Sequence, residues 1–457
     1  MPSTPPTSRP FPWSKVAHGV VILLTLILAD QRIRFTAEHT SNIFTWDQWD
    51  IYKPMFAGGN WWRIFDYQHG PHRQGVGYLF TAALAHFTHW DSRGDALLTV
   101  VVTVLAALAA LALARKCGAR DGPALAVVPL IFLTMRQFEA WIGPANPSHG
   151  AFPVLLMMLY GLTWFMASPT WRRVVQVVLI LFLIFTGFAL FAGALAPLLF
   201  GFELWHARRS GDARSIRALA VALLLCAGFW VLFFVGYKNE PAVANFRFPY
   251  EHPWEYGGFA GLMLASYAGW QAHLWLDFAG GLSLLLLVAF LAVVHGRRLY
   301  RYGPAARPAS AVIFLLTAFT VLYCLNTAVG RVMLGWRTAP YAPRYVTLLI
   351  PAFFALYLEA ELLPARLWRY AGLAVLFLVT ASAGLFVTPE EKSAVTWYSA
   401  NRAKWREVYL ETGSQQKADA ATSPDQGYVI YPADLTPRLQ FLREHHLNLF
   451  KSDRHEP

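Results

Sequence analysis

The hydrophobic residues of this chain are grouped in long runs, and most polar residues lie in the segments between them. Apolar runs lie at 16–29, 74–90, 95–114, 122–135, 151–167, 174–206, 216–237, 257–296, 309–329, 345–360 and 365–387. A helix needs about 20 residues to cross a bilayer, because each residue advances it by only about 1.5 Å. The pattern therefore predicts an all-α polytopic membrane protein.

Two of these runs are too long for a single span, and a third is expected not to cross. We expect 174–206 to fold back as a pair of helices, and 257–296 to contain one span and a shorter membrane-associated piece. The run at 74–90 is short and carries two histidines, so we predict an interfacial or re-entrant helix there. This gives about 11 transmembrane helices, or about 13 if both short segments cross.

Clusters of arginine and lysine between the runs predict the orientation, because basic loops are retained in the cytoplasm. Such clusters lie at 115–120, 172–173, 208–217, 297–307 and 366–369. The segments then expected outside the cytoplasm are the loops 31–73, 137–149, 238–256 and 330–344 and the tail after Thr388. The N-terminus is accordingly predicted to be cytoplasmic and the C-terminus to be outside.

The chain is expected to have two parts. Residues 1–388 form a transmembrane domain with an outer loop at 31–73, and residues 389–457 form a small extracytoplasmic region. That region has amphipathic helix patterns and a strand-like segment at 428–431, which predicts a small α/β piece docked on the outer face. A cleaved signal peptide is the alternative for the first run, but no A-x-A site follows Leu28, so we favour an uncleaved span.

Composition and charge agree with a membrane protein. Of the 457 residues, 56% are hydrophobic and 14% are charged, whereas about a quarter are charged in a typical soluble protein. The net charge is +11, but the basic residues lie at the ends of apolar runs, so topology and anionic lipid or phosphate explain it better than nucleic acid does. The three cysteines show no disulfide or zinc spacing.

The first outer loop contains the best candidate for chemistry, the sequence WDQWD. Asp47 and Asp50 stand three residues apart and would share one face of a helix. Close to lipid, a carboxylate is expected to have a raised pKa and could act as a general base on a hydroxyl. Trp46 and Trp49 suit either stacking on a sugar ring or an interfacial belt. An ordinary solvated loop explains the segment equally well.

A second outer loop carries planar polar side chains. Gln137, Glu139 and Asn146 stand among aromatic residues, a combination typical of a carbohydrate subsite. Helix capping is a simpler explanation for Asn146.

Arginines in two outer segments suggest a phosphate site. A guanidinium forms paired hydrogen bonds with phosphate oxygens, and arginines in an outer loop break the orientation rule followed elsewhere. Snorkelling membrane anchors are the alternative. The candidates are His72, Arg73, Arg331, Arg344 and Tyr345.

Together these segments resemble the GT-C superfamily of membrane glycosyltransferases, and in particular poorly characterised bacterial members. The resemblance covers most of the chain through short elements of the family. The D-x-W element corresponds to 47–49, the last two letters of N-E-H-R to 72–73, the start of Q-x-E-N to 137–140, and G-R…R-Y to 330–331 and 344–345.

The resemblance implies an inverting transfer of a sugar from a polyprenyl-phosphate donor to a lipid or glycan acceptor, in a bacterial cytoplasmic membrane. Asp47 would be the base, Asp50 a helper or metal ligand, and an arginine would hold the departing lipid phosphate. Some relatives use a divalent metal, so a metal is possible here. The alternatives are a lipid-linked polysaccharide polymerase or ligase and, less favoured because the spans are nearly free of charge, a lipid-linked sugar transporter or flippase.

Overall fold

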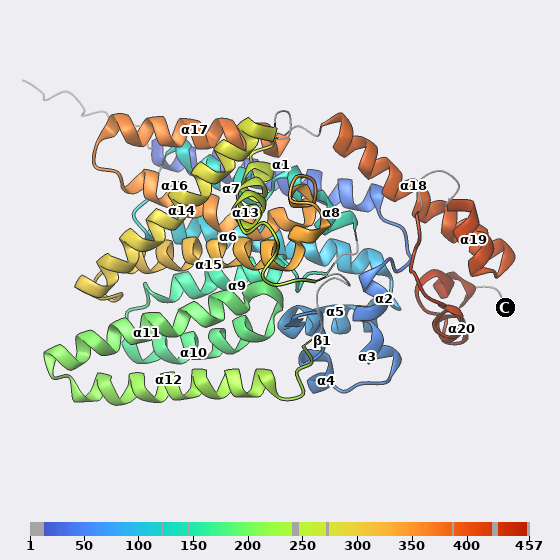
Figure 1. Ribbon diagram of the computed structural model, residues 1–457, viewed down its shortest axis with the longest axis horizontal. Helices are drawn as coiled ribbons and strands as arrows, with labels where there is room; N and C mark the ends of the chain where they lie inside the picture. Colours follow the sequence, from blue (N-terminus) through green and yellow to red (C-terminus); the bar gives the residue numbers. More distant parts are fainter. Residues whose placement is uncertain are drawn as a thin grey trace, which may run out of the picture.

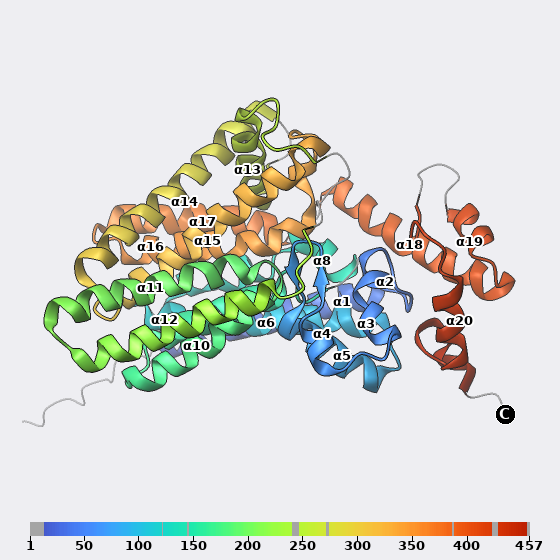
Figure 2. The ribbon, with the colours of Figure 1, turned by 60° about the horizontal axis from the view of Figure 1, so that its bottom comes forward.

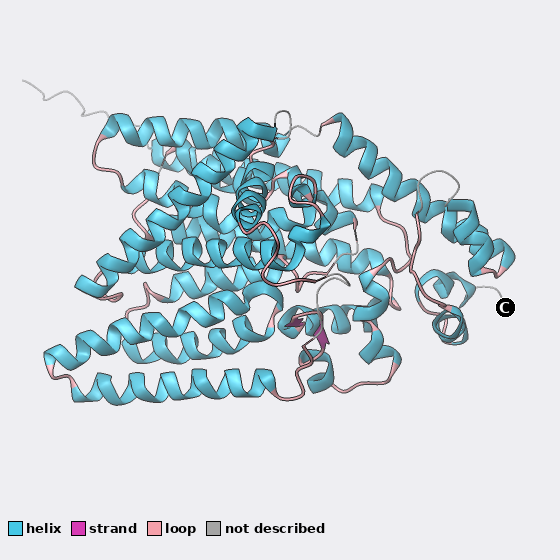
Figure 3. Ribbon diagram, viewed as in Figure 1, coloured by secondary structure: helices cyan, strands magenta, loops and turns pink. Residues whose placement is uncertain are grey.

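The structure is a computed structural model and describes residues 13–120, 122–143, 146–239, 246–270, 274–385, 388–422 and 428–454. Almost all of its regular structure is helical (Figure 3). The strands among the described residues are one antiparallel pair, β1 (Gln68–His69) and β2 (His72–Arg73). The all-α prediction for the membrane domain is confirmed.

Most helices run along the long axis of the molecule and form one bundle (Figure 1). The long ones are α1 (Trp13–His39), α6 (Ser92–Lys116), α11 (Leu190–Ser210), α12 (Ala213–Phe234), α14 (Leu274–Tyr302), α15 (Pro308–Arg331) and α17 (Arg366–Leu385). Shorter ones are α7 (Val127–Phe132), α8 (Phe138–Ile142), α9 (Ala151–Thr163), α10 (Pro169–Phe185), α13 (Trp254–Tyr267) and α16 (Ile350–Leu362). Short 3₁₀ turns extend several of them, including η1 (Pro123–Ala126), η2 (Met135–Gln137), η3 (Gly187–Ala189) and η6 (Pro343–Leu349).

Eight helical segments among the described residues are long and apolar enough to cross a membrane. Their outer faces are apolar: on α12, Leu224 and Val231 are 72% and 69% exposed, which suits contact with lipid rather than water. Three further helices, α9, α10 and α17, pack against these segments. If all three also crossed, the chain would have eleven spans, which is the lower of the two predicted numbers. That number stays a prediction.

Both long apolar runs divide as expected. Helix α10 ends at Phe185, and α11 begins at Leu190 after a turn that contains Gly187. Gly187 has φ +54°, and a Cβ there would lie 1.9 Å from the carbonyl oxygen of Ser148, so only glycine fits this close approach. The second run separates into α13 and α14.

The run at 74–90 forms α5 (Gly75–Thr88), a helix of 14 residues. At about 1.5 Å per residue it is shorter than the roughly 30 Å of a bilayer core. Its length therefore agrees with the predicted interfacial or re-entrant helix.

The two ends of the bundle differ in chemistry. The turns that join α11 to α12, α14 to α15 and α16 to α17 lie together at the left of Figures 1 and 2, and arginines flank each of them. We call this the basic end. At the opposite end, which we call the polar end, lie β1, β2, α2 (Asp47–Ile51), α3 (Lys53–Phe56), α4 (Trp61–Phe65) and the C-terminal helices. The basic loops therefore share one end, as predicted; which end faces the cytoplasm stays a prediction.

The C-terminal region docks on the polar end, as expected, but the part of it that the structure describes contains helices and turns and no strand. Its described elements are α18 (Pro389–Thr412), α19 (Gln415–Thr422), α20 (Thr436–Glu444) and η7 (Asn448–Arg454). The strand predicted at 428–431 is wrong. This segment instead accepts two hydrogen bonds from Trp46, from its backbone N to Ile430 O at 2.8 Å and from its ring Nε1 to Val429 O at 2.7 Å.

A shared hydrophobic core holds this region in place. Phe44, Trp49 and Tyr52 of the first loop are buried together with Trp405 and Leu439 of the C-terminal helices. The first loop and the C-terminal region therefore pack as one unit.

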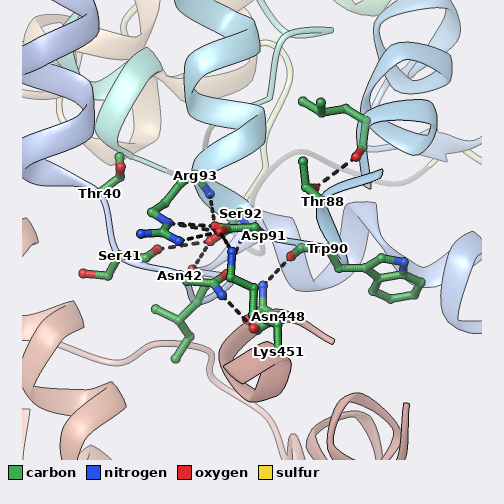
Figure 4. A network of polar contacts seen from close by, with 12 residues as sticks. Thr40, Ser41, Asn42, Thr88, Trp90, Asp91, Ser92, Arg93, Asn448 and Lys451 are labelled. Atoms are coloured by element: carbon green, nitrogen blue, oxygen red, sulfur yellow. Dashed lines mark hydrogen bonds and ion pairs between the residues drawn. The ribbon is translucent and has the colours of Figure 1, made fainter. Parts of the chain in front are cut away.

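A polar network adds to this contact (Figure 4). The Asn448 amide donates to Trp90 O at 2.7 Å, and the Asn42 amide donates to Asn448 O at 2.6 Å. Lys451 pairs with Asp91, the N-cap of α6. The turn η7 is thus tied to the start of a membrane helix.

Candidate active site

A small cavity at the polar end brings together residues from several of the predicted segments. Its volume is about 60 Å³, and it is lined by Asp47, Thr99, Glu139, Ala140, Asn146, His149, Gly150, Ala151, Arg344 and Thr347. Four of these, Asp47, Glu139, Asn146 and Arg344, are candidates from the sequence. They come from three separate regions of the chain, so the fold assembles what the sequence only suggested.

The local backbone presents Asp47 to this cavity. Asp47 is the first residue of α2, and its side chain is 54% exposed, whereas Gln48 and Trp49 behind it are buried. The preceding Trp46 has φ +47°, a conformation that L residues rarely adopt, and its two hydrogen bonds to 429–430 hold it there. Strain of this kind often lies at functional sites.

The charge on Asp47 is stabilised, contrary to the raised pKa expected from the sequence. His69 Nε2 lies 4.0 Å from Asp47 Oδ2. The contact with His69 contributes most to lowering the pKa of Asp47 to about 2, and the charge of Arg344 acts in the same direction, while partial burial opposes them. Asp47 is therefore a carboxylate at any physiological pH.

His149 forms the neutral wall of the cavity. Burial lowers the pKa of His149 to about 3. Its Nε2 lies 3.5 Å from the amide nitrogen of Gln74, whose Oε1 accepts a 2.8 Å hydrogen bond from Asn146. The chain of contacts fixes the orientation of the ring and of Asn146.

His72 lies next to this wall. Its ring is buried, packs edge-on to His149 with 4.8 Å between ring centroids, and contacts Phe188. Burial lowers the pKa of His72 well below its usual range, and neither ring nitrogen has a hydrogen-bond partner among the described residues. A buried ring of this kind can still supply a neutral donor to a ligand that reaches it.

Arg344 and Arg331 flank one aromatic ring. The centre of the Arg344 guanidinium lies 5.7 Å from the centroid of Tyr345, and that of Arg331 lies 6.0 Å from it. Arg344 also pairs with the buried Glu139 at 3.6 Å, and its backbone N donates to Glu139 Oε2 at 3.2 Å. Because the Arg344 side chain is 46% exposed, its guanidinium can bind a further anion.

Arg73 has a different environment from these two arginines. Its guanidinium donates to Phe233 O at 2.6 and 2.9 Å and to Val235 O at 2.6 Å, and it pairs with Asp66 at 2.8 Å. These contacts satisfy the carbonyl groups at the end of α12. Arg73 therefore fastens a helix end, and we leave it out of the phosphate site.

Asp50 also makes structural contacts and does not line the cavity. Its Oδ1 accepts a 2.6 Å hydrogen bond from Tyr431 and pairs with Lys53 at 2.8 Å, and Arg438 lies 3.9 Å away. Two of these partners belong to the C-terminal region. Asp50 thus anchors that region to α2.

Two of the expected sugar contacts are structural as well. Trp49 is fully buried. Gln137 accepts from Thr347 at 2.9 Å and donates to Phe132 O at 2.6 Å, so its amide stiffens the cavity wall.

The possible divalent metal receives no support from side-chain positions. Within the described part of the chain, no group of three or more His, Cys, Asp or Glu side chains could hold a metal ion.

The sequence interpretation overlooked His69 and His149. Both stand within three residues of a candidate from the sequence: His69 precedes His72 in QHGPHR, and His149 follows Asn146 in NPSH. Their proximity to Asp47 depends on the packing of three loops and could not be inferred from spacing. Comparisons with protein families, with curated proteins and with solved structures give no match for this chain.

Proposed function

We propose that this protein is a membrane glycosyltransferase that moves a sugar from a polyprenyl-phosphate donor to a hydroxyl of a lipid or glycan acceptor at the polar end. The observation that carries the proposal is the cavity in which the ionised Asp47 and the guanidinium of Arg344 both take part. A transfer from a phosphate donor needs one group that accepts the proton of the acceptor hydroxyl and one that stabilises the negative charge on the leaving phosphate. The cavity offers both.

In the proposed reaction, the acceptor oxygen attacks the anomeric carbon of the sugar from the side opposite the phosphate. The new C–O bond forms as the bond to the phosphate oxygen breaks, and the phosphate leaves with that electron pair. Asp47 takes the hydroxyl proton. Because attack and departure occur on opposite faces, the anomeric configuration is inverted.

The low pKa of Asp47 shapes its role. A carboxylate with a pKa of about 2 is always ready to accept a proton but is a weak base. It can deprotonate the hydroxyl only as the C–O bond forms and the hydroxyl becomes strongly acidic. We therefore expect a late proton transfer, with much of the rate coming from charge stabilisation on the leaving phosphate.

Arg344 and Arg331 are the groups proposed to stabilise the negative charge on the leaving phosphate. Both lie against Tyr345, and paired guanidinium bonds match the oxygens of a phosphate. Asn146, held by Gln74, is the proposed contact for a sugar hydroxyl.

A donor panel tests this proposal. The purified full-length protein is incubated with polyprenyl-phosphate sugars and a membrane lipid extract as acceptor, and the released polyprenyl phosphate is quantified. We expect release from at least one donor, release at least about 100-fold slower from the Asp47→Asn variant, and a product of inverted configuration. A product that retains the donor configuration would contradict the single displacement.

A further inference from the structure

A second, larger cavity lies at the basic end, away from Asp47 and its neighbours. Its volume is about 520 Å³, and it forms where α6, α14 and α16 end and α15 begins. Lys116, Arg298 and Arg307 line it, each on a different element or loop, and no acidic side chain does. Figures 1 and 2 show this end at the left of the bundle.

These three cations have no carboxylate of the described residues within ion-pair distance, although Arg298 is close enough to Glu359 to interact with it electrostatically. The nearby Glu359 is already paired with His295 at 3.0 Å. Three like charges around one cavity repel each other unless an anion lies between them.

Helix dipoles explain two of the cations but not the third. Lys116 and Arg298 stand near the C-termini of α6 and α14, where a positive charge is favourable. Arg307 precedes the N-terminus of α15, where a positive charge is unfavourable.

Free hydrogen-bond donors converge on the same place. Helix α15 has no side-chain cap, and its first intrahelical bond runs from Ala311 N to Arg307 O at 3.1 Å. The N–H groups of Ala309 and Ser310 come before it and lie at the cavity wall. The Ser310 side chain is only 7% exposed, and its hydroxyl has no hydrogen-bond partner among the described residues.

We propose that this cavity binds the phosphate of an anionic phospholipid headgroup, such as that of phosphatidylglycerol. Unfilled N–H donors at a helix start and surrounding cations are the features that bind phosphate elsewhere. A lipid source fits because α14, which supplies Arg298, exposes the apolar Leu286, Phe290 and Val293 where acyl chains could lie. This site is independent of the proposed transfer reaction.

Lipid titration of the purified full-length protein in detergent tests the site. Binding of fluorescent phosphatidylglycerol is measured for the parent, for the double variant Arg298→Gln/Arg307→Gln, and for the control Arg214→Gln/Arg217→Gln. The control removes two exposed arginines from the same end but outside the cavity. Phosphatidylcholine and inorganic phosphate serve as competitors.

We expect the cavity variant to bind about tenfold more weakly or worse, and the control to stay within about twofold of the parent. Ser310→Ala, which removes one hydroxyl, should weaken binding about fivefold. This milder change tests the site even if the double variant does not fold. Equal losses in both double variants, or equal competition by phosphatidylcholine, would overturn the site. Displacement by inorganic phosphate at concentrations equal to the lipid would show a free-phosphate site and overturn the lipid assignment.

Discussion

At the scale of single residues, the protonation states of the side chains define the chemistry of the cavity around Asp47. Asp47 is held ionised, while the buried His72 and His149 are held neutral. Arg344 keeps its charge beside Glu139 and remains accessible. The combination leaves one acceptor of protons and one binder of anions in the same cavity.

The geometry of Arg331 and Arg344 leads to a first prediction. Arg331→Lys and Arg344→Lys should each weaken donor binding by about tenfold and lower turnover, because lysine keeps the charge but cannot form paired bonds with phosphate. Donor titrations on the purified variants measure this. Arg337→Lys is the control, since Arg337 lies over Trp336 at 5.2 Å. Parent-like affinity in both test variants would remove these arginines from the phosphate site.

The neutral histidines predict how stability depends on pH. The pKa of His149 is about 3 in the folded protein and about 6.5 in an unfolded chain, so below pH 6.5 the unfolded state binds more protons. The stabilisation by neutral His149 is complete above pH 6.5 and declines as the pH falls toward 3, by at most about 1.4 kcal/mol per pH unit. His72 acts in the same direction.

Thermal unfolding in detergent between pH 7.5 and 5 checks this dependence. His149→Gln should show a shallower decline than the parent, whereas His445→Gln, a change at the exposed residue that follows α20, should keep the parent slope. An unchanged slope in His149→Gln would contradict the neutral state assigned to this residue.

At the scale of elements, helix breaks and loop contacts place the site. The turn at Gly187 brings α10 and α11 against the loop that contains Ser148 and His149. Gly187→Ala should therefore lower the stability by about 2 kcal/mol or more, because alanine is strained at φ +54° and its Cβ would collide with Ser148 O.

A comparison of unfolding temperatures tests the role of this turn. Gly201→Ala is the matched control: Gly201 lies within α11 with open space around it, so alanine there should be neutral or stabilise by up to about 1 kcal/mol. Equal stability of the two variants would show that the turn tolerates a side chain.

The elements also show how far sequence reasoning reaches. The helix division near Gly187 and the short α5 could be predicted, because apolar run length and glycine act locally. The sequence could not show that 428–431 is no strand. The carbonyl groups of Val429 and Ile430 accept hydrogen bonds from Trp46, which lies nearly 400 residues away in the chain. The pKa of Asp47 and the role of Arg73 had the same limitation. Each is decided by partners elsewhere in the chain: His69 and Arg344 for Asp47, and the end of α12 for Arg73.

At the scale of the whole molecule, the polar and basic ends predict a topology. Basic turns share one end and the C-terminal region lies at the other, so a cytoplasmic basic end places the C-terminal region outside. A reporter active only outside the cytoplasm should be active when fused after Pro457 and inactive when inserted in the α11–α12 turn at Gly211. The opposite pattern would reverse the orientation and place the Asp47 cavity in the cytoplasm.

The central claim is that Asp47 accepts the proton of the acceptor hydroxyl, and a matched pair of variants tests it most directly. Asp47→Asn and Asp50→Asn make the same change three residues apart in α2, and both donor binding and turnover are measured with the donor that the panel identifies. We predict that Asp47→Asn lowers turnover by about 10²–10⁴-fold with donor affinity nearly unchanged, and that Asp50→Asn keeps turnover within about tenfold of the parent. Parent-like turnover in Asp47→Asn would contradict the account.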